Sequence, residues 1–138
     1  MLVDSMIADL WSEASCKEEV TNNPDVEAFK AALESLDGIK RTLLSLQCKN
    51  GRELVIGGGD NGYVVYVAFS EMEFWNLLST ADQVELVYVT AGGQRGDYAA
   101  RYVVDKQRAF EAGVSFIQDG GLAKSLRWEE QARRKSRF

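Results

Sequence analysis

Hydrophobic and polar residues alternate through the middle of the chain, and this alternation predicts β-strands. In residues 44–48, two leucines and a cysteine alternate with a serine and a glutamine, the pattern of a half-buried strand. Asn50-Gly51 then gives the strongest short-range signal for a hairpin turn and leads into a second strand at 53–56. Residues 63–69 hold three valines, two tyrosines and one phenylalanine, a composition typical of a central strand.

Glycine-rich turns delimit these strands. Gly57-Gly58-Gly59 and Asp60-Asn61-Gly62 lie between the second and third strands. Two further strands are predicted at 84–90 and 98–104, joined by a glycine-rich loop over 92–96. The pattern therefore predicts an antiparallel meander.

A helical period precedes the strands. Asn23 is the predicted N-cap, Pro24 suits the first helical position, and Asp25 and Glu27 lie at the positive end of the helix dipole. Gly38 is the predicted stop. The apolar side of this predicted helix consists of Val26, Phe29, Leu33 and Leu36.

A second helix is predicted after the meander. Asp105 is its predicted N-cap and Gly120-Gly121 its end, with Phe110, Val114 and Ile117 facing inward. Beyond it, Leu126 and Trp128 predict a short terminal element.

The first 22 residues fit two structures. Met6, Ile7, Leu10 and Trp11 match one face of a helix, and a short strand before a loop fits nearly as well. The whole pattern predicts an α+β fold: a mostly antiparallel sheet of about five to six strands with two packed helices. At 138 residues the chain is expected to form a single domain over 1–131, followed by a basic tail at 132–138 that we predict to be disordered.

The amino-acid composition excludes several kinds of catalytic and metal site. The chain has no histidine, which excludes Ser-His-Asp and Cys-His catalysis and removes the commonest metal ligand. Cys16 and Cys48 have no CxxC spacing and are too few for a structural zinc site, so we expect small, reduced core residues, with a disulfide as the less favoured reading. Neither a metal nor another cofactor is predicted.

No targeting signal is evident. No apolar run approaches the ~18–20 residues of a membrane helix. The N-terminus has an acid at Asp4 and no positive region, unlike a secretory signal. A cytoplasmic protein without membrane contact is the expectation.

Charge is unevenly distributed. The formal net charge is −5, yet residues 132–138 carry four basic residues, so residues 1–131 hold 12 basic and 21 acidic residues, a net charge of −9. Such a body repels nucleic acid and favours a basic partner. Solubility alone would also account for the acidity.

The glycines match two known nucleotide-binding motifs, but the residues around them exclude both kinds of site. Gly57, Gly59 and Gly62 satisfy G-x-G-x-x-G, but a strand follows them where a dinucleotide site needs a helix. The protein-kinase version needs a lysine on the next strand and a histidine-containing catalytic loop, which this chain lacks. The glycines are therefore expected to serve a tight turn with positive φ and close packing.

The remaining candidate groups are carboxylates and tryptophans. Glu71 and Glu73 would share a face if their strand continued, as paired-carboxylate chemistry requires, although a solvated strand end explains them more simply. For Trp75 and Trp128 the base expectation is core packing. An interface anchor is the alternative, and it is favoured more for Trp75 than for Trp128 because Trp75 follows an acidic stretch.

The order of these features resembles a known family. A helix, two strands, the Gly-Gly-Gly turn, a Gly-Tyr-Val-Val-Tyr strand, a Trp-bearing segment and a late helix precede a closing Leu-Arg-Trp-Glu. Over roughly residues 24–130 this is similar to the first Imm family of bacterial immunity proteins, small α+β antidotes to polymorphic toxins. Gly58, Gly59, Gly62 and Trp128 carry most of the resemblance and look like fold-defining positions. The family supplies no catalytic residues.

The resemblance implies a cytosolic, non-enzymatic immunity protein that occludes the active site of a cognate toxin, for example a deaminase-like toxin that attacks nucleic acid. A small-ligand-binding or regulatory α+β module is the alternative, and a carboxylate enzyme built on Glu71 and Glu73 is the least favoured. For the toxin-binding surface we predict the acidic and aromatic residues Asp60, Glu71, Glu73, Trp75 and Asp97, brought to one edge of the sheet.

Overall fold

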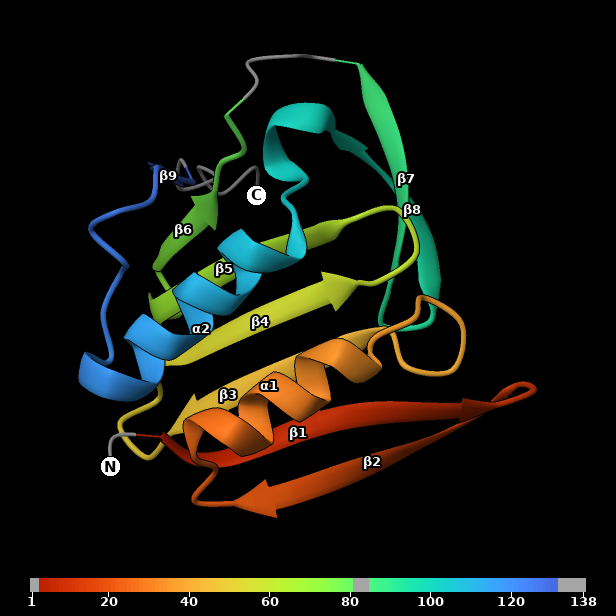
Figure 1. Cartoon of the computed structure of the whole chain (residues 1–138), viewed down its shortest axis with the longest axis horizontal. Helices are drawn as coiled ribbons and strands as arrows, with labels where there is room; N and C mark the ends of the chain where they lie inside the picture. The colour runs from red at the N-terminus through yellow and green to blue at the C-terminus, as the bar shows by residue number, and fades with distance from the viewer. Residues whose placement is uncertain (1–2, 81–84, 132–138) are drawn as a thin grey trace, which may run out of the picture.

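The computed structural model describes residues 3–80 and 85–131. Its strands are β1 (Val3–Ser12), β2 (Ser15–Asn22), β3 (Leu43–Cys48), β4 (Glu53–Gly58), β5 (Tyr63–Ser70), β6 (Glu73–Leu77), β7 (Leu86–Ala91), β8 (Gln94–Ala99) and β9 (Trp128–Glu130). Its helices are α1 (Val26–Ser35), the short 3₁₀-helix η1 (Ala100–Tyr102) and α2 (Lys106–Asp119). The fold is α+β, as predicted (Figure 1).

Seven of the strands form one antiparallel sheet in the order β2-β1-β3-β4-β5-β6-β9, and β7 pairs with β8 in a separate two-stranded ribbon. The predicted meander of 44–69 is therefore confirmed as β3, β4 and β5. The expected number of about five to six strands was too low. The structure adds β1 and β2 before the meander and β6 and β9 after it.

Residues 3–22 form a β-hairpin, so the helical interpretation was wrong. The alternative, a short strand before a loop, was right for β1 and wrong for β2, which is a second strand where a loop was expected. β1 pairs with β2 on one side and with β3 on the other. Met6 lies opposite Leu46 in β3, and both side chains are buried in the core. Trp11 lies at the other end of β1, where its indole donates to Asp9, so the helical spacing of these residues is coincidental.

Helix α1 begins and ends at other residues than predicted. Asp25, not Asn23, is the N-cap, because its carboxylate accepts from the backbone N–H of Ala28 at 2.8 Å. Asn23 has a positive φ of 50° and lies before the helix. The helix ends before Gly38, with Leu36 as its C-cap.

Helix α2 agrees better with its prediction. Asp105 caps it by accepting from the backbone N–H of Arg108 at 2.9 Å, and Gly120 ends it in the left-handed conformation. Ile117 is buried as expected, whereas Phe110 and Val114 are only half-buried. The fully inward positions of α2 are Ala109, Ala112, Gly113, Phe116 and Ile117.

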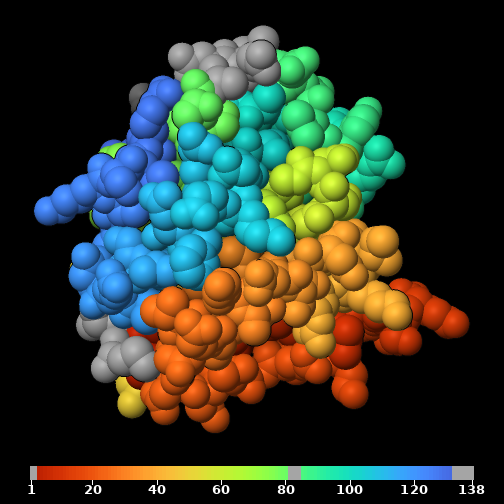
Figure 2. All heavy atoms as spheres, in the orientation of Figure 1, coloured from red at the N-terminus to blue at the C-terminus, as the bar shows by residue number. Residues whose placement is uncertain are grey.

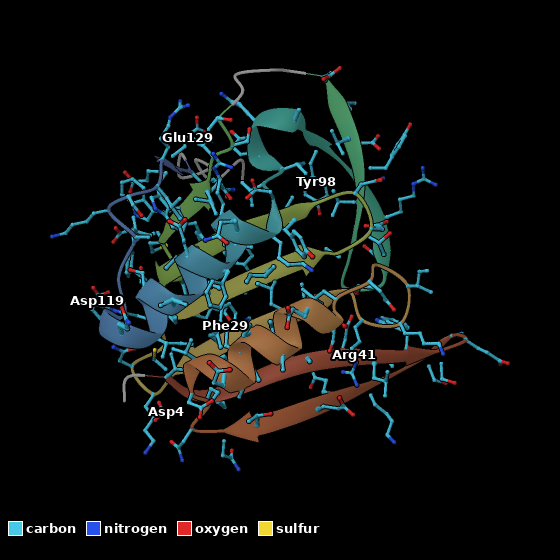
Figure 3. All side chains as sticks on the ribbon, in the orientation of Figure 1. Asp4, Phe29, Arg41, Tyr98, Asp119 and Glu129 are labelled. Carbon is cyan, nitrogen blue, oxygen red and sulfur yellow. The ribbon has the colours of Figure 1, made fainter. Side chains whose placement is uncertain are left out.

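Both helices cover the same face of the seven-stranded sheet, and the core lies between them and the strands (Figures 1 and 2). Phe29 of α1 stacks on Phe110 of α2 with ring centroids 6.0 Å apart. A Cβ at Gly113 would lie 2.0 Å from the Phe29 ring, so this glycine allows the two helices to approach. Phe29 itself is fully buried (Figure 3).

The second half of the meander differs most from its prediction. The predicted loop at 92–96 is a tight turn at Gly92-Gly93, and β8 begins at Gln94. The predicted strand 98–104 ends at Ala99, where the chain turns into η1. The predicted start of the preceding strand at Val84 lies outside the described residues.

The two cysteines differ in environment. Cys48 packs against the core, in keeping with its prediction. Cys16 is exposed on β2, so its predicted place in the core was wrong. Both are free thiols.

No helix in the described part of the chain is long and apolar enough to cross a membrane.

Candidate functional site

The face of the sheet that turns away from the helices carries the β7–β8 ribbon across one end (Figure 1). Close backbone packing holds the ribbon there. A Cβ at Gly57 of β4 would lie 2.4 Å from the Cβ of Ala91, and one at Gly58 would lie 3.1 Å from the side chain of Val89. Val89 is 0% exposed. Gly57 and Gly58, at the end of β4, thus form the surface against which the ribbon packs.

The outer side of this ribbon exposes large apolar side chains. Leu86 is 64% exposed and Tyr88 is 49% exposed, two residues apart on β7 and on the opposite side of the strand from Val89. On β8, Asp97 lies directly opposite Tyr88, and the guanidinium of Arg95 lies 4.2 Å from the centre of the Tyr88 ring. We call these outward residues the hairpin face: Leu86, Tyr88, Thr90, Arg95, Asp97 and Ala99.

The loop before β5 supports one edge of the hairpin face. The carboxylate of Asp60 accepts from the hydroxyl of Thr90 at 3.3 Å, and the side-chain amide of Asn61 donates to the backbone carbonyl of Tyr88 at 2.9 Å. Asp60 and Asp97 therefore flank the exposed Tyr88. Two of the five predicted toxin-binding residues lie at this surface.

The other three predicted residues lie at the opposite end of β5, so the expected single acidic edge is wrong. Glu71 is exposed in the turn between β5 and β6, and Glu73 begins β6. The eight residues of β5 separate this turn from Asp60, roughly 25 Å of extended chain. A strand long enough to span the sheet places its two flanking turns at opposite rims.

Trp75 lies beside Glu73, and its indole N–H donates to the Glu73 carboxylate at 2.9 Å. Trp75 pairs with the core residue Val67, so its side chain is on the helix side of the sheet, where it is partly exposed. Trp128 is different, because it packs against the core and donates to the carbonyl of Ala123 at 3.1 Å.

The glycines that carry the family resemblance have conformations that only glycine adopts readily. Gly58, Gly59 and Gly62 have φ values of 121°, 116° and 111°. A Cβ at Gly59 would lie 2.5 Å from the backbone of Leu36, at the end of α1. These residues set the path of the turn on which the ribbon rests.

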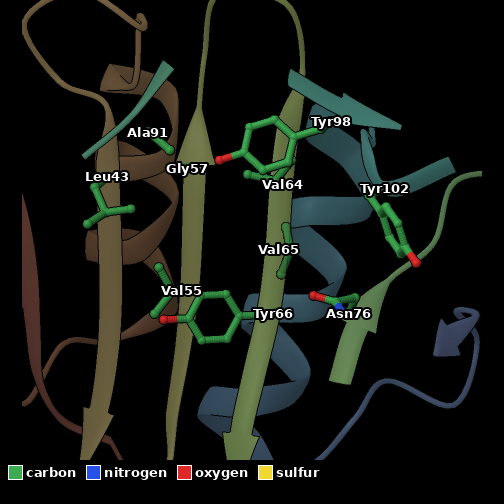
Figure 4. Close-up of a pocket in the computed structure, with 10 residues that line it drawn as sticks. All are labelled: Leu43, Val55, Gly57, Val64, Val65, Tyr66, Asn76, Ala91, Tyr98 and Tyr102. Carbon is green, nitrogen blue, oxygen red and sulfur yellow. The ribbon is translucent and has the colours of Figure 1, made fainter. Parts of the chain in front are cut away.

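A hollow of about 250 Å³ opens on the sheet face under the ribbon (Figure 4). Its walls are mainly apolar, from Leu43, Val55 and Val64 of the sheet and Ala91 of β7. We call it the tyrosine hollow, because Tyr66 of β5, Tyr98 of β8 and Tyr102 of η1 line it together with Asn76 of β6. Tyr98 lies close to β5 in the whole-chain view as well (Figure 3).

Charged groups lie near two of these tyrosines. Burial raises the pKa of Tyr66, and the negative charge of Glu53 raises it further. The hydroxyl of Tyr102 donates to Glu129 and accepts from Arg101 at 2.8 Å. The hydrogen bond to Glu129 is the main reason that the pKa of Tyr102 is raised.

Sequence reasoning missed Leu86, Tyr88 and the tyrosine hollow. Val-Tyr-Val in β7 reads as an ordinary half-buried strand, and only the contacts of Val89 show which side faces outward. Within the described residues, no three acidic or cysteine side chains gather as metal ligands would. The arrangement is suited to non-covalent binding through exposed aromatic and acidic groups.

No protein-family model matches the chain, and no curated protein matches its sequence.

Proposed function

We propose that this protein is a non-enzymatic, cytoplasmic immunity protein that binds a basic toxin domain and occludes its active site. The observation that carries the proposal is the hairpin face: Leu86 and Tyr88 exposed side by side, with Asp97 opposite and Asp60 at the edge. Exposed aromatic residues ringed by polar groups are typical of protein–protein binding sites. The resemblance to the first Imm family supports the same class.

The energetics favour an aromatic anchor. Tyr88 already has one face covered by Arg95, which limits its rotamers before binding and so lowers the entropic cost of complex formation. Tyrosine is among the residues that dominate binding free energy at interfaces, with losses of about 2 kcal/mol or more on truncation. Leu86 adds apolar area next to it.

Charge supports a basic partner. Residues 1–131 hold 12 basic and 21 acidic residues. A toxin that acts on nucleic acid needs a cationic substrate channel. An acidic inhibitor is steered toward such a channel and can occupy it in place of phosphate groups.

The tyrosine hollow supports a second candidate, a small-ligand-binding or regulatory module. Its volume of about 250 Å³ is slightly below the range of drug-sized ligand pockets, ~300–1,000 Å³. Binding of a small metabolite at micromolar concentration, with no affinity for a toxin domain, would favour this second function.

The test uses the C-terminal domain of any large secreted, toxin-like protein that the neighbouring gene encodes. Calorimetric titration should give tight binding, and Tyr88→Ala and Leu86→Ala should each weaken it at least about tenfold, because both remove exposed anchors. Val20→Ala is the matched control: Val20 is 58% exposed on β2, away from the hairpin face. Melting temperatures should stay within a few degrees for all three variants. Wild-type affinity in Tyr88→Ala would contradict the proposed surface, and no binding by the wild type would contradict the function.

A further inference from the structure

We infer that the tyrosine hollow binds the guanidinium group of an arginine side chain presented by the toxin partner. This inference rests on the proposed function and adds the chemical group that the second surface recognises. The hairpin face and the tyrosine hollow share the β7–β8 ribbon, with Tyr98 of β8 on the inner side and Asp97 on the outer side. A partner that contacts the outer side of the ribbon and extends past it onto the sheet face beside it would reach both.

The lining of the hollow fits a flat cation on an apolar stem. The residues that line it include no charged side chain. Arg101 already stacks on the Tyr102 ring, so the rings of Tyr66 and Tyr98 are the ones that a guest cation would meet. A guanidinium is planar, weakly hydrated and stacks on aromatic faces, unlike the compact ammonium of lysine. The methylene groups of arginine would pack against Leu43, Val55 and Val64.

The negative charge of Glu53 acts on one ring of the hollow. The Glu53 charge acts on the Tyr66 hydroxyl strongly enough to raise its pKa. Glu53 accepts a hydrogen bond from the hydroxyl of Ser45 only at the long distance of 3.5 Å. Glu129 is paired with Arg101 at 3.5 Å. Glu53 lies two residues from the lining residue Val55 on the same side of β4, so a guest cation would be drawn toward Glu53.

The described structure already contains the same contact at two other tyrosines, Tyr88 and Tyr102. The guanidinium of Arg95 lies 4.2 Å from the Tyr88 ring centre, and that of Arg101 lies 4.7 Å from the Tyr102 ring centre. Both distances are within the ~6 Å of a favourable cation–π contact. An apolar guest would instead remove water from Glu53 and from the tyrosine hydroxyls without giving them a hydrogen-bond partner.

The first experiment separates charge from shape. The full chain is titrated with n-butylguanidinium chloride and, separately, with the neutral isostere n-butylurea, while ring resonances of Tyr66 and Tyr98 are followed by NMR. The cation should give saturable shifts with a millimolar Kd, and the urea should bind at least about fivefold more weakly. Equal binding of the two probes, or no saturable shift with the cation, would overturn the inference.

The second experiment tests the residues. Tyr66→Leu, Tyr98→Leu and Glu53→Gln should each weaken butylguanidinium binding about three- to tenfold, whereas Tyr66→Phe keeps most of it because the ring remains. Tyr88→Leu is the control, a tyrosine outside the hollow. Unchanged butylguanidinium binding in both Tyr66→Leu and Tyr98→Leu would place the cation outside the hollow. Toxin binding without butylguanidinium binding would remove this inference and leave the proposed function intact.

Discussion

The carboxylate of Asp9 accepts two hydrogen bonds from Thr42, one from its backbone N–H at 2.7 Å and one from its hydroxyl at 2.5 Å. Both residues are buried, and Asp9 also accepts from the backbone N–H of Leu43 and from the indole of Trp11. The Thr42 oxygen in turn accepts from the backbone N–H of Gly93, in the turn of the ribbon. One aspartate thus connects β1, the start of β3 and the β7–β8 ribbon.

Asp9→Ala should therefore be strongly destabilising. It leaves the buried backbone N–H of Thr42 and the partly buried one of Leu43 without an acceptor, at about 1–3 kcal/mol for each unpaired group. We expect the free energy of unfolding in urea to fall by about 3–5 kcal/mol. Glu18→Ala is the matched control, because Glu18 lies opposite Asp9 on β2 but is exposed. Similar unfolding midpoints for the two variants would contradict the role given to Asp9.

Gly57→Ala should loosen the ribbon by a clash that a second substitution removes. The new Cβ would lie 2.4 Å from the Cβ of Ala91, a distance that forces β4 and β7 apart. Overpacking of this kind costs about 1–3 kcal/mol in unfolding free energy. The double variant Gly57→Ala with Ala91→Gly should recover most of that loss in the same urea titration. A double variant as unstable as the sum of its single variants would show that the two residues do not share this contact.

Charge reversal on β8 and in the β5–β6 turn should distinguish the two acidic groups. Asp97→Lys and Glu71→Lys change the net charge equally, but only Asp97 belongs to the hairpin face. We expect Asp97→Lys to weaken toxin binding by about 1–4 kcal/mol, mostly through slower association that depends on salt. Stopped-flow rates give the measurement. If Glu71→Lys, alone or with Glu73→Lys, has the larger effect, the toxin binds at the β5–β6 turn and beside Trp75.

Asp37 should contribute a pH-dependent part of the stability. Its carboxylate accepts from the backbone N–H groups of Arg41, Ile39 and Lys40, and these bonds lower its pKa below the ordinary 3.8. A carboxyl with a lowered pKa in the folded state stabilises the fold above its unfolded pKa, and this stabilisation is lost as the pH falls through the folded value. The stability difference between wild type and Asp37→Asn should therefore be constant above about pH 5 and shrink as the pH falls below the ordinary value of 3.8 toward the lower folded pKa. If the unfolding free energies of wild type and Asp37→Asn differed by the same amount at every pH, the role given to Asp37 would be contradicted.

The sequence predicts the centre of the sheet well because one face of each strand is buried. Leu44 and Leu46 of β3 contact the core and Ser45 between them lies on the other face, so the period of two is visible in the residues themselves. β2 shows no such signal, since all eight of its residues are exposed. Its position is fixed by hydrogen bonds to β1, which leave no mark on the pattern of side chains.

The site was harder to predict because contacts between distant parts of the chain decide which side of β7 faces outward. In β7 the residues Tyr88 and Val89 have similar strand propensity. Val89 faces inward because its side chain packs directly against Gly58 of β4. Asp60 and Asp97 were found through their turn context. The fold then brings Asp60 to the ribbon through Thr90, a contact across 30 residues that local pattern cannot register.

The fully exposed β2 strand has a consequence for how this chain can vary. Since none of its eight side chains is buried, they can change without altering the volume of the core. The register of β2 comes from backbone pairing with β1, so diversification there is constrained mainly by strand propensity and by the need to avoid pairing with other chains. Lys17, Glu18 and Glu19 meet that second need through their charge. The rim of the sheet is thus a segment in which related sequences can drift apart while the strands behind it keep their packing.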